Sequence, residues 1–187
     1  LLFLNDDTEV VSPDWIESLL ACAQIPGAGV VGAKLLYPQG DVQHGGIFLV
    51  NQGAWARHAF RHLRHPENSY QGLLGVIRNC SAVTFACALV SRRLFEELGG
   101  LDEKLKVECN DVDFCLRALA RGKRNIWTPF AVLVHHELVT RVKTHHPGDM
   151  AYFKNRWKKL LEQGDPYYNV NLSQDSDMYL PAGRLEP

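Results

Sequence analysis

Short apolar runs rich in β-branched residues alternate along this chain with segments of helical periodicity, and this alternation constrains its fold more than any other feature. The runs that we predict as strands cover residues 1–4, 29–37, 42–50, 81–90, 124–128 and 131–135. The segments that we predict as helices cover residues 14–23, 92–98, 110–121 and 150–163. Strands and helices that alternate in this way favour an α/β domain built in layers.

Serine, proline and glycine mark several of the predicted boundaries. Ser12 is expected to cap the first helix, with Pro13 at its first helical position. Gly122 stands where the C-terminal cap of the 110–121 helix belongs. Residues 51–75 are polar and rich in His and Arg, and we expect a long excursion with a little helix there. Loops of this length in a compact domain are usually functional.

The domain organisation is predicted to be simple. We expect residues 1–163 to form one folded portion, and residues 164–187, which are rich in Pro, Asn and Ser, to form an extended tail. Residues 1–4 are expected to form a buried strand. Because the sequence starts inside that strand without Met, we expect upstream sequence of the natural protein to be missing.

Composition argues against several classes of protein. With 187 residues, 46 % of them hydrophobic, the chain is long enough for one domain with a sizeable core. The formal net charge of -1 argues against a protein that binds nucleic acid non-specifically. Every apolar run is shorter than the roughly 20 residues that span a bilayer. The five cysteines show no CxxC spacing, which favours free thiols in a reducing compartment.

Two carboxylates, Asp6 and Asp7, directly follow the first predicted strand. Ligands of open α/β sheets bind beyond the carboxyl ends of the strands. Two acids at that place suit Mg²⁺ or Mn²⁺, which prefer a few protein oxygens together with substrate phosphates. The alternative is that both acids only cap a turn, and the tetrapeptide alone does not decide between the two.

Two further clusters lie at ends of predicted elements. Asp111 and Asp113 fall in the first turn of the 110–121 helix, where the helix dipole alone favours acids. His135 and His136 follow the last predicted strand, and histidine is a common metal ligand. Each cluster taken alone is explained by structure. All three clusters at one edge of the sheet would instead indicate a catalytic site.

Six stretches in this order carry a family resemblance. They read LLFLNDDTEV, GAKLLYPQGDVQHGG, NCSAVTFACALVSRRLFEELGGLDE, NDVDFCLRALARG, VLVHHE and DPYYNVNLS. Over residues 1 to about 172 the chain resembles family-2 glycosyltransferases of the GT-A fold, and among them the rhamnosyltransferase-like enzymes of bacterial surface polysaccharides. The resemblance implies a partial GT-A domain, Rossmann-like, with a mixed sheet and helices on both faces. The N-terminal nucleotide-binding part of that fold would be missing.

The resemblance also implies roles for individual residues. Asp7 occupies the metal-binding position of a DxD-type motif for Mn²⁺ or Mg²⁺, and Asp6 would lie near the donor's ribose or diphosphate. Asp111 matches the catalytic base. His135 matches the third metal-ligand position, with His136 as its substitute. The residues expected on the acceptor side are Gly99, Gly100, Asp102, Asp113 and His136.

Three positions depart from the family pattern. Asn5 and Asn110 stand where many members carry Asp and Glu, which removes charge and predicts a weaker metal site. Phe85 replaces a small residue, which predicts a narrower acceptor pocket.

The implied reaction is inverting transfer of a sugar, of the hexosyl-transferring type, from a nucleoside-diphosphate sugar to a saccharide or lipid-linked saccharide acceptor. With the nucleotide-binding part missing, this chain alone is expected to have little activity. The expected location is cytoplasmic, with peripheral contact at the inner membrane face through the aromatic and basic 150–163 helix. Packing of that helix on its own domain is the alternative.

Two other functions compete with this interpretation. One is a sugar nucleotidyltransferase, which shares Asp–metal chemistry, and the other is a non-catalytic glycan-binding module of a larger polysaccharide-assembly protein. A zinc site is a third hypothesis, because His58, His62 and His65 lie at helix-compatible spacing. The interleaved Arg57 and Arg61 would repel a cation, so a basic loop facing solvent or substrate is the simpler interpretation.

Overall fold

The computed structural model describes residues 1–51, 55–64, 69–137 and 146–183. Its strands are β1 Leu2–Leu4, β2 Thr8–Val10, β3 Ala28–Leu36, β4 Val42–His44, β5 Ile47–Leu49, β6 Ala56–His58, β7 Arg78–Cys80, β8 Cys87–Val90 and β9 Arg124–His135. Its helices are α1 Trp15–Ala23, the 3₁₀ helix η1 Tyr70–Gly75, α2 Arg92–Glu97, α3 Asn110–Ala120 and α4 Pro147–Gln163. Among these described residues, no helix is both long and apolar enough to cross a membrane.

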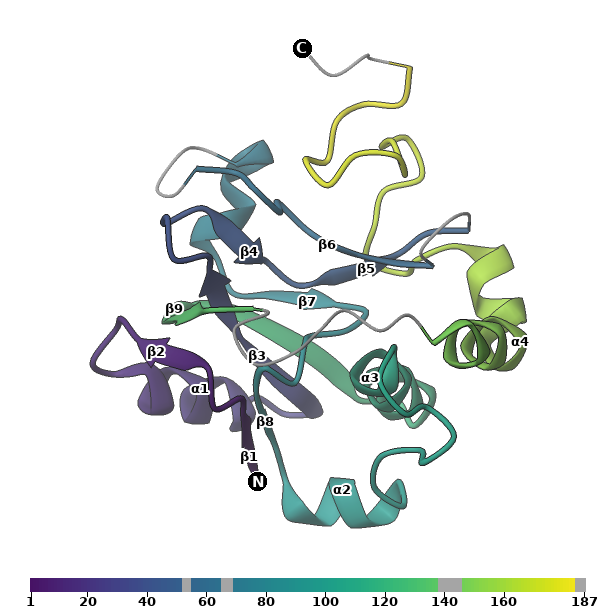
Figure 1. Ribbon diagram of the computed structural model, residues 1–187, viewed down its shortest axis with the longest axis horizontal. Helices are drawn as coiled ribbons and strands as arrows, with labels where there is room; N and C mark the ends of the chain where they lie inside the picture. The colour runs from purple at the N-terminus through teal and green to yellow at the C-terminus, as the bar shows by residue number, and fades with distance from the viewer. Residues whose placement is uncertain (52–54, 65–68, 138–145, 184–187) are drawn as a thin grey trace.

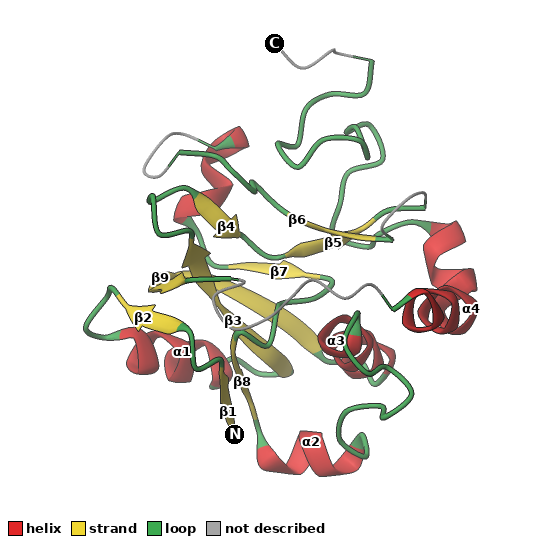
Figure 2. Ribbon diagram, in the orientation of Figure 1, coloured by secondary structure: helices red, strands yellow, loops and turns green. Residues whose placement is uncertain are grey.

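Seven of the described strands form one mixed sheet in the order β1-β8-β3-β9-β2, with β4 beside β3 and β7 beside β9 (Figure 2). β3 pairs with β9 in parallel, while β8 is antiparallel to both β1 and β3. Consequently β1, β3 and β9 run in the same direction, and their carboxyl ends point to one edge of the sheet. β5 and β6 form a separate two-stranded sheet.

Helices cover both faces of the large sheet, with α1 on one face and α3 on the other (Figure 1). Alternate residues of β3 reach two separate cores, because successive side chains of a strand point to opposite faces. Val31, Ala33 and Leu35 pack with Leu19 of α1, whereas Val30 and Leu36 join the larger core beneath α3. The predicted α/β architecture with a mixed sheet is therefore confirmed.

Gly32 lets the chain segment before β8 approach the centre of the sheet closely. A Cβ atom built on Gly32 would lie 2.4 Å from the Cβ of Val83, a separation that real side chains do not reach. Because only glycine fits, Val83 can lie directly over β3. The residues that follow Val83 contact both Asn5 after β1 and Asp111 of α3.

The first strand differs from its prediction. β1 forms, but it is an edge strand that pairs only with β8, and Leu2 and Leu4 are 40 % and 46 % exposed. The prediction of a buried strand is therefore wrong for this structure. The apolar run resembles a core strand in sequence, yet the described chain places nothing on its outer edge.

The start of α1 also differs from its prediction. The helix begins at Trp15, with Asp14 as the preceding residue and no side-chain cap. Ser12 does not cap the helix, because its hydroxyl accepts a hydrogen bond from the Val132 amide of β9 at 2.8 Å. Ser12 therefore ties the loop to the sheet, and Pro13 lies before the helix rather than inside it.

The two strands predicted on either side of Pro129 are one continuous strand, β9. Pairing with β3 shifts register between Gly32 and Lys34, opposite the proline. A proline lacks the N–H that a central strand must donate, and a shift in register at that point accommodates it. The short strands β2, β6 and β7 were not predicted, since three residues give too little alternation to detect.

Residues 165–183 contain neither helix nor strand but pack against the two-stranded sheet. The ring of Tyr168 stacks on Phe48 of β5 at 4.2 Å between centroids, and that of Tyr179 stacks on Phe60 at 4.7 Å. Both tyrosines are buried. Aromatic stacking thus anchors this described part of the tail, while the boundary proposed near residue 163 stays a prediction.

Candidate functional site

The loop that follows β1 meets the end of β9 at one edge of the sheet. Thr8 pairs with His135 in the antiparallel ladder between β2 and β9, and the backbone amide of His136 donates to the Asp7 carbonyl at 2.9 Å. This pairing places Asp7 Oδ1 3.1 Å from His135 Nε2, and both side chains are nearly buried, at 13 % and 12 % exposed. The structure therefore brings these two predicted metal ligands together.

Gln43 of β4 determines which nitrogen of His135 carries the proton. Its Nε2 donates to the His135 carbonyl at 3.2 Å, which turns its Oε1 toward His135 Nδ1 at 2.7 Å. Because Oε1 can only accept, Nδ1 must be protonated. The other ring nitrogen, Nε2, accepts a hydrogen bond from the amide of Asn5 at 3.2 Å. The lone pair of Nε2 is thus directed at the Asn5 side chain, while Asp7 Oδ1 lies 3.1 Å from the same nitrogen.

The Oδ1 atom of Asp7 is buried and has no hydrogen bond in the described structure. Its neighbour, the lone pair of His135 Nε2, is also an acceptor, so the two groups do not satisfy each other. A divalent cation stabilises such a pair by binding to both atoms. The donor set, one carboxylate oxygen and one imidazole nitrogen whose Nδ1–H is held by an amide, fits a metal ion.

The described residues supply few ligands to such an ion. No group of three or more His, Cys, Asp or Glu side chains is arranged to hold a metal in the part of the chain that the structure describes. Mn²⁺ and Mg²⁺ are commonly held by one or two protein side chains and completed by water and substrate phosphates. Asp7 and His135 therefore fit a metal that is bound together with a phosphorylated substrate.

The neighbouring predicted residues lie close by but do not join this pair. Asp6 is exposed to solvent. The ring of His136 lies 3.4 Å from the carboxylate of Glu9 on β2. His135 therefore lies beside Asp7, whereas His136 lies at the surface beside Glu9.

Asp111 lies at the start of α3, as predicted, and faces residues 84–86. Its carboxylate accepts from the Val112 amide at 2.7 Å and from the Phe85 amide at 3.3 Å. Burial raises the pKa of Asp111, although hydrogen bonds from Val112, Phe85 and Thr84 partly counteract that effect. A carboxylate with a raised pKa is a better proton acceptor near neutral pH than an exposed one.

The segment 84–86 connects the two acids. The carbonyl of Ala86 accepts a hydrogen bond from the backbone amide of Asn5 at 3.0 Å, and Asn5 lies in the loop that carries Asp7. The Thr84 side chain hydrogen-bonds Asp111. Thr84 also lines a pocket at the same edge of the sheet, together with Tyr37, Gln43, His58, Arg61, His135 and Glu137. A ligand in this pocket would lie between the Asp7–His135 pair and the segment that contacts Asp111.

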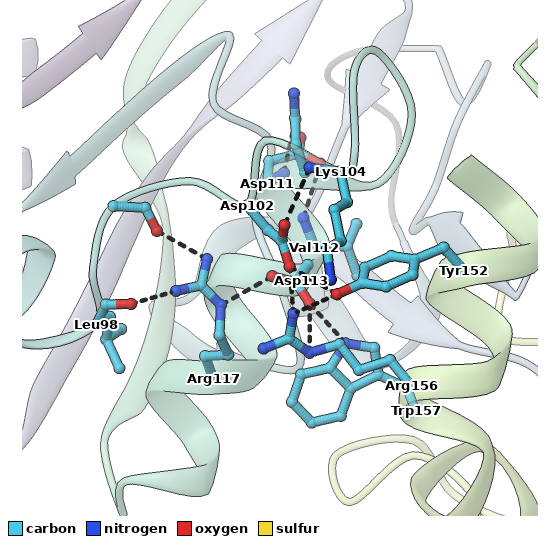
Figure 3. A network of polar contacts seen from close by, with 12 residues as sticks. Leu98, Asp102, Lys104, Asp111, Val112, Asp113, Arg117, Tyr152, Arg156 and Trp157 are labelled. Carbon is cyan, nitrogen blue, oxygen red and sulfur yellow. Dashed lines mark hydrogen bonds and ion pairs between the residues drawn. The ribbon is translucent and has the colours of Figure 1, made fainter. Parts of the chain in front are cut away.

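Asp113 belongs to a different environment, the network between α3 and α4 shown in Figure 3. It is fully buried, and its oxygens bind Arg117 Nε at 2.8 Å and Trp157 Nε1 at 2.9 Å. Arg156 Nε lies 3.3 Å from the same carboxylate. Each oxygen of Asp113 is thus used within the protein.

The other residues expected on the acceptor side surround this network. Arg117 donates to the carbonyls of Leu98 and Gly100 at 2.7 and 2.8 Å, which holds the turn after α2. Gly99 and Gly100 both have a positive φ, of 76° and 75°, which favours glycine. Asp102 accepts from Tyr152 at 2.9 Å and from Arg156 at 2.5 Å. Their acceptor-side role stays a prediction.

The zinc hypothesis rested on a helical spacing that the structure does not contain. His58 lies in β6, while His62 adopts a positive φ of 67° and stacks on Tyr37. His65 lies outside the described residues.

Sequence reasoning missed three residues of this edge, Gln43, His44 and Thr84, and it considered His58 only as a zinc ligand. Gln43 and His44 belong to the stretch GAKLLYPQGDVQHGG, so the family resemblance pointed to them without assigning a role. Their contacts join β4, β6 and the segment before β8, which are far apart in sequence.

No protein-family model matches the chain. It is similar to an uncharacterized protein, y4gI, of Sinorhizobium fredii, with 42 % identity over 97 % of this chain and 21 % of that protein. It is also 42 % identical to the O-antigen biosynthesis protein RfbC of Myxococcus xanthus, over 92 % of this chain and 14 % of RfbC. An N-acetylglucosaminyl-diphospho-decaprenol L-rhamnosyltransferase of Mycobacterium tuberculosis is 25 % identical over 82 % of this chain and 57 % of that enzyme. The chain thus spans only about a fifth of the length of y4gI and about a seventh of the length of RfbC.

Proposed function

We propose that this chain is the catalytic and acceptor-side part of an inverting, metal-dependent glycosyltransferase in bacterial surface-polysaccharide synthesis. Two of its relatives support this assignment by name, one in O-antigen biosynthesis and one as a rhamnosyltransferase. The donor would be a nucleoside-diphosphate sugar, and the acceptor a saccharide or lipid-linked saccharide. The names of these relatives support the class of reaction, and the geometry of the site supports individual roles.

One observation carries the proposal: a buried oxygen of Asp7 without a hydrogen bond lies 3.1 Å from Nε2 of His135. The backbone pairing of β2 with β9 holds the two side chains in this position. A buried acceptor without a partner costs free energy, and a cation bound to Asp7 and His135 would remove that cost. The site lies at the carboxyl ends of parallel strands, where open α/β sheets bind ligands.

Each residue has a distinct role in this proposal. Asp7 and His135 hold Mn²⁺ or Mg²⁺, which would neutralise charge that develops on the leaving diphosphate. The exposed Asp6 lies beside them on the side of the donor's ribose or diphosphate. Asp111 accepts the proton of the acceptor hydroxyl as its oxygen attacks the anomeric carbon. One base without a covalent partner predicts inversion at that carbon.

Location follows from the proposed acceptor. A lipid-linked acceptor would bring the enzyme to the cytoplasmic face of the membrane. The exposed Lys154, Lys158 and Lys159 of α4 would supply positive charge for that contact. Lys158 lies 3.9 Å from Glu162 of the same helix, and Arg156 is engaged by Asp102 and Asp113.

The test is calorimetric titration of nucleoside diphosphates into the natural full-length protein, with and without Mn²⁺, beside an assay of sugar transfer. Asp7→Asn should abolish Mn²⁺-dependent nucleotide binding. Asp111→Asn should keep that binding but lower transfer by roughly 10²- to 10⁴-fold, the usual contribution of a general base. If no nucleotide binds, the enzyme assignment fails and a glycan-binding module becomes the better interpretation.

A further inference from the structure

A pair of histidines lies next to the metal-ligand pair and has no role in the proposed chemistry. His44, the last residue of β4, is fully buried, and its ring meets that of His58 edge-on, with centroids 4.9 Å apart. Gly45 makes this approach possible, because a Cβ there would lie 2.7 Å from the Ala59 carbonyl oxygen. The backbone of β6 can therefore lie directly against the turn that follows β4.

Hydrogen bonds determine the tautomer of both rings. The backbone amide of Thr84 donates to His44 Nε2 at 3.5 Å, and an amide can only donate. His44 Nε2 is therefore unprotonated, so its Nδ1 carries the hydrogen and donates to His58 Nδ1 at 3.0 Å. His58 Nδ1 then acts as an acceptor, and in the neutral ring the proton must be on Nε2.

His58 is partly exposed and lines the pocket beside His135 and Thr84. No protein group in the described structure accepts a hydrogen bond from its Nε2. The two-histidine chain thus presents a fixed N–H donor at a pocket that borders both the metal-ligand pair and the segment in contact with Asp111.

We propose that His58, oriented by His44, is a specificity-determining residue whose Nε2–H donates to a hydroxyl oxygen of a neutral sugar bound in this pocket. The inference rests on the proposed function, because it assigns the pocket to one of the sugars of that reaction. In this assignment His58 does not touch the reacting atoms. It fixes the orientation of the bound sugar, which is either the donor sugar or the acceptor sugar.

The charge of the pocket favours a neutral sugar over a phosphate. Arg61 is balanced by Glu137, with 3.9 Å between Nη2 and Oε2, and its Nε donates to the Tyr37 hydroxyl at 2.7 Å. Burial lowers the pKa of His58 to about 4, so the ring is uncharged at neutral pH. The lining therefore combines donors and acceptors without a net positive charge, which suits neighbouring hydroxyl groups better than an anion.

The first test measures the tautomers and does not depend on enzymatic activity. Long-range ¹H–¹⁵N spectra of this chain labelled with ¹⁵N-histidine should show His44 protonated at Nδ1 and His58 protonated at Nε2. A His58 ring protonated at Nδ1, or at both nitrogens at pH 7, would overturn the proposal.

The second test measures binding of simple sugars by titration in the same spectra. The probes are methyl glycosides of neutral hexoses and deoxyhexoses, with methyl β-D-glucuronide as the anionic comparison. At least one neutral glycoside should shift the His58 signals. His58→Leu should weaken its binding by at least about fivefold, the cost of a lost buried hydrogen bond, whereas His58→Gln, which keeps an N–H donor, should stay within about threefold.

His146→Leu is the matched control, because His146 is a partly buried histidine at the start of α4, outside the pocket. Equal binding by wild type and His58→Leu, or tighter binding of the glucuronide, contradicts the inference. Failure of the proposed function has a different signature. In that case the full-length protein transfers no sugar from any nucleotide donor, while the tautomers and the sugar-induced shifts of His58 remain.

Discussion

Two buried carboxylates, Asp7 and Asp113, show opposite relations to the protein around them. Asp113 binds Arg117 and Trp157 within 2.9 Å, and neither of its oxygens lacks a partner. Asp7 has a buried oxygen without a hydrogen bond, beside an imidazole nitrogen that also accepts. The same residue type is thus a structural link between two helices in one region and, in the proposed function, part of an incomplete metal-ligand set in the other.

The difference separates stability from function. A buried charge that is fully paired is costly to disturb, because its loss leaves the partner charge uncompensated. A buried acceptor without a partner contributes little to stability and is kept where a ligand completes it. Substitutions of the two aspartates should therefore have opposite effects on folding and on ligand binding, and this contrast can be tested.

Asp113→Ala is expected to have the largest effect. It leaves the guanidinium of Arg117, only 13 % exposed, without its carboxylate, and it removes the acceptor for Trp157. Breaking a buried ion pair in this way costs about 3–5 kcal/mol. Urea unfolding of the chain measures the loss. Asp102→Asn serves as the comparison, because Asp102 is 19 % exposed and should cost less; equal losses would contradict the special role of Asp113.

Asp7→Asn is expected to have the opposite signature. The substitution replaces a partly paired, nearly buried charge by a neutral amide, so the free energy of unfolding should stay within about 0.5 kcal/mol of wild type or rise. Affinity for Mn²⁺ in the presence of a nucleoside diphosphate should fall by about 100-fold. Loss of a residue that only supports a metal ligand can cost as little as about 10-fold. A destabilised Asp7→Asn protein would show that Asp7 is a structural residue like Asp113.

The sequence predicted this contrast only in part. Asp7 and His135 were expected at one edge because each follows a strand, and the structure brings them within 3.1 Å. The contact itself depends on the pairing of β2 with β9, and the three residues of β2 carry no readable pattern. Asp111 at a helix start was read correctly from its position, since α3 has a clear apolar side.

The residues that sequence reasoning missed depend on contacts between distant segments. Gln43 is 92 residues from His135, and His44 reaches His58 only because Gly45 permits a close backbone approach. Likewise, Asp111 and Asp113 are two residues apart in one helical turn. The local sequence does not reveal that Trp157 of α4 donates a hydrogen bond to Asp113. Helix periodicity predicts elements, whereas partners across elements follow from packing.

Gln43→Leu tests the proposed metal site through a residue that supports His135 but does not itself bind the metal. The substitution removes the acceptor of His135 Nδ1–H, so the ring loses the contact that fixes its tautomer and orientation. Loss of such an outer-shell partner typically lowers metal affinity by about 10- to 100-fold. Mn²⁺ titration in the presence of a nucleoside diphosphate measures the effect. Gln43→Glu keeps an acceptor and should stay within about threefold of wild type; equal loss in both variants would show that Gln43 acts by packing alone.

The smallest expected effect is a pH dependence of stability that arises from the histidine pair beside the site. Burial lowers the pKa of His58 to about 4 in the folded chain, whereas an unfolded histidine titrates near about 6.5. Between these values the unfolded chain binds a proton that the folded chain does not, so stability falls as pH decreases from about 6.5 toward 4. The contribution of His58 is fully present above that window.

His58→Gln removes this titrating group while keeping the N–H donor. Between pH 7 and pH 4.5, the free energy of unfolding should fall by roughly 1–2 kcal/mol less in the variant than in wild type. This difference is smaller than the full value of such a pKa shift, because the ring is partly exposed. Part of the slope should remain, since burial also lowers the pKa of His44. Urea unfolding at several pH values, with His146→Leu as the control, measures the difference. Parallel curves for wild type and His58→Gln would show that the pKa of His58 is the same in the folded and unfolded chain, which contradicts the burial of its ring.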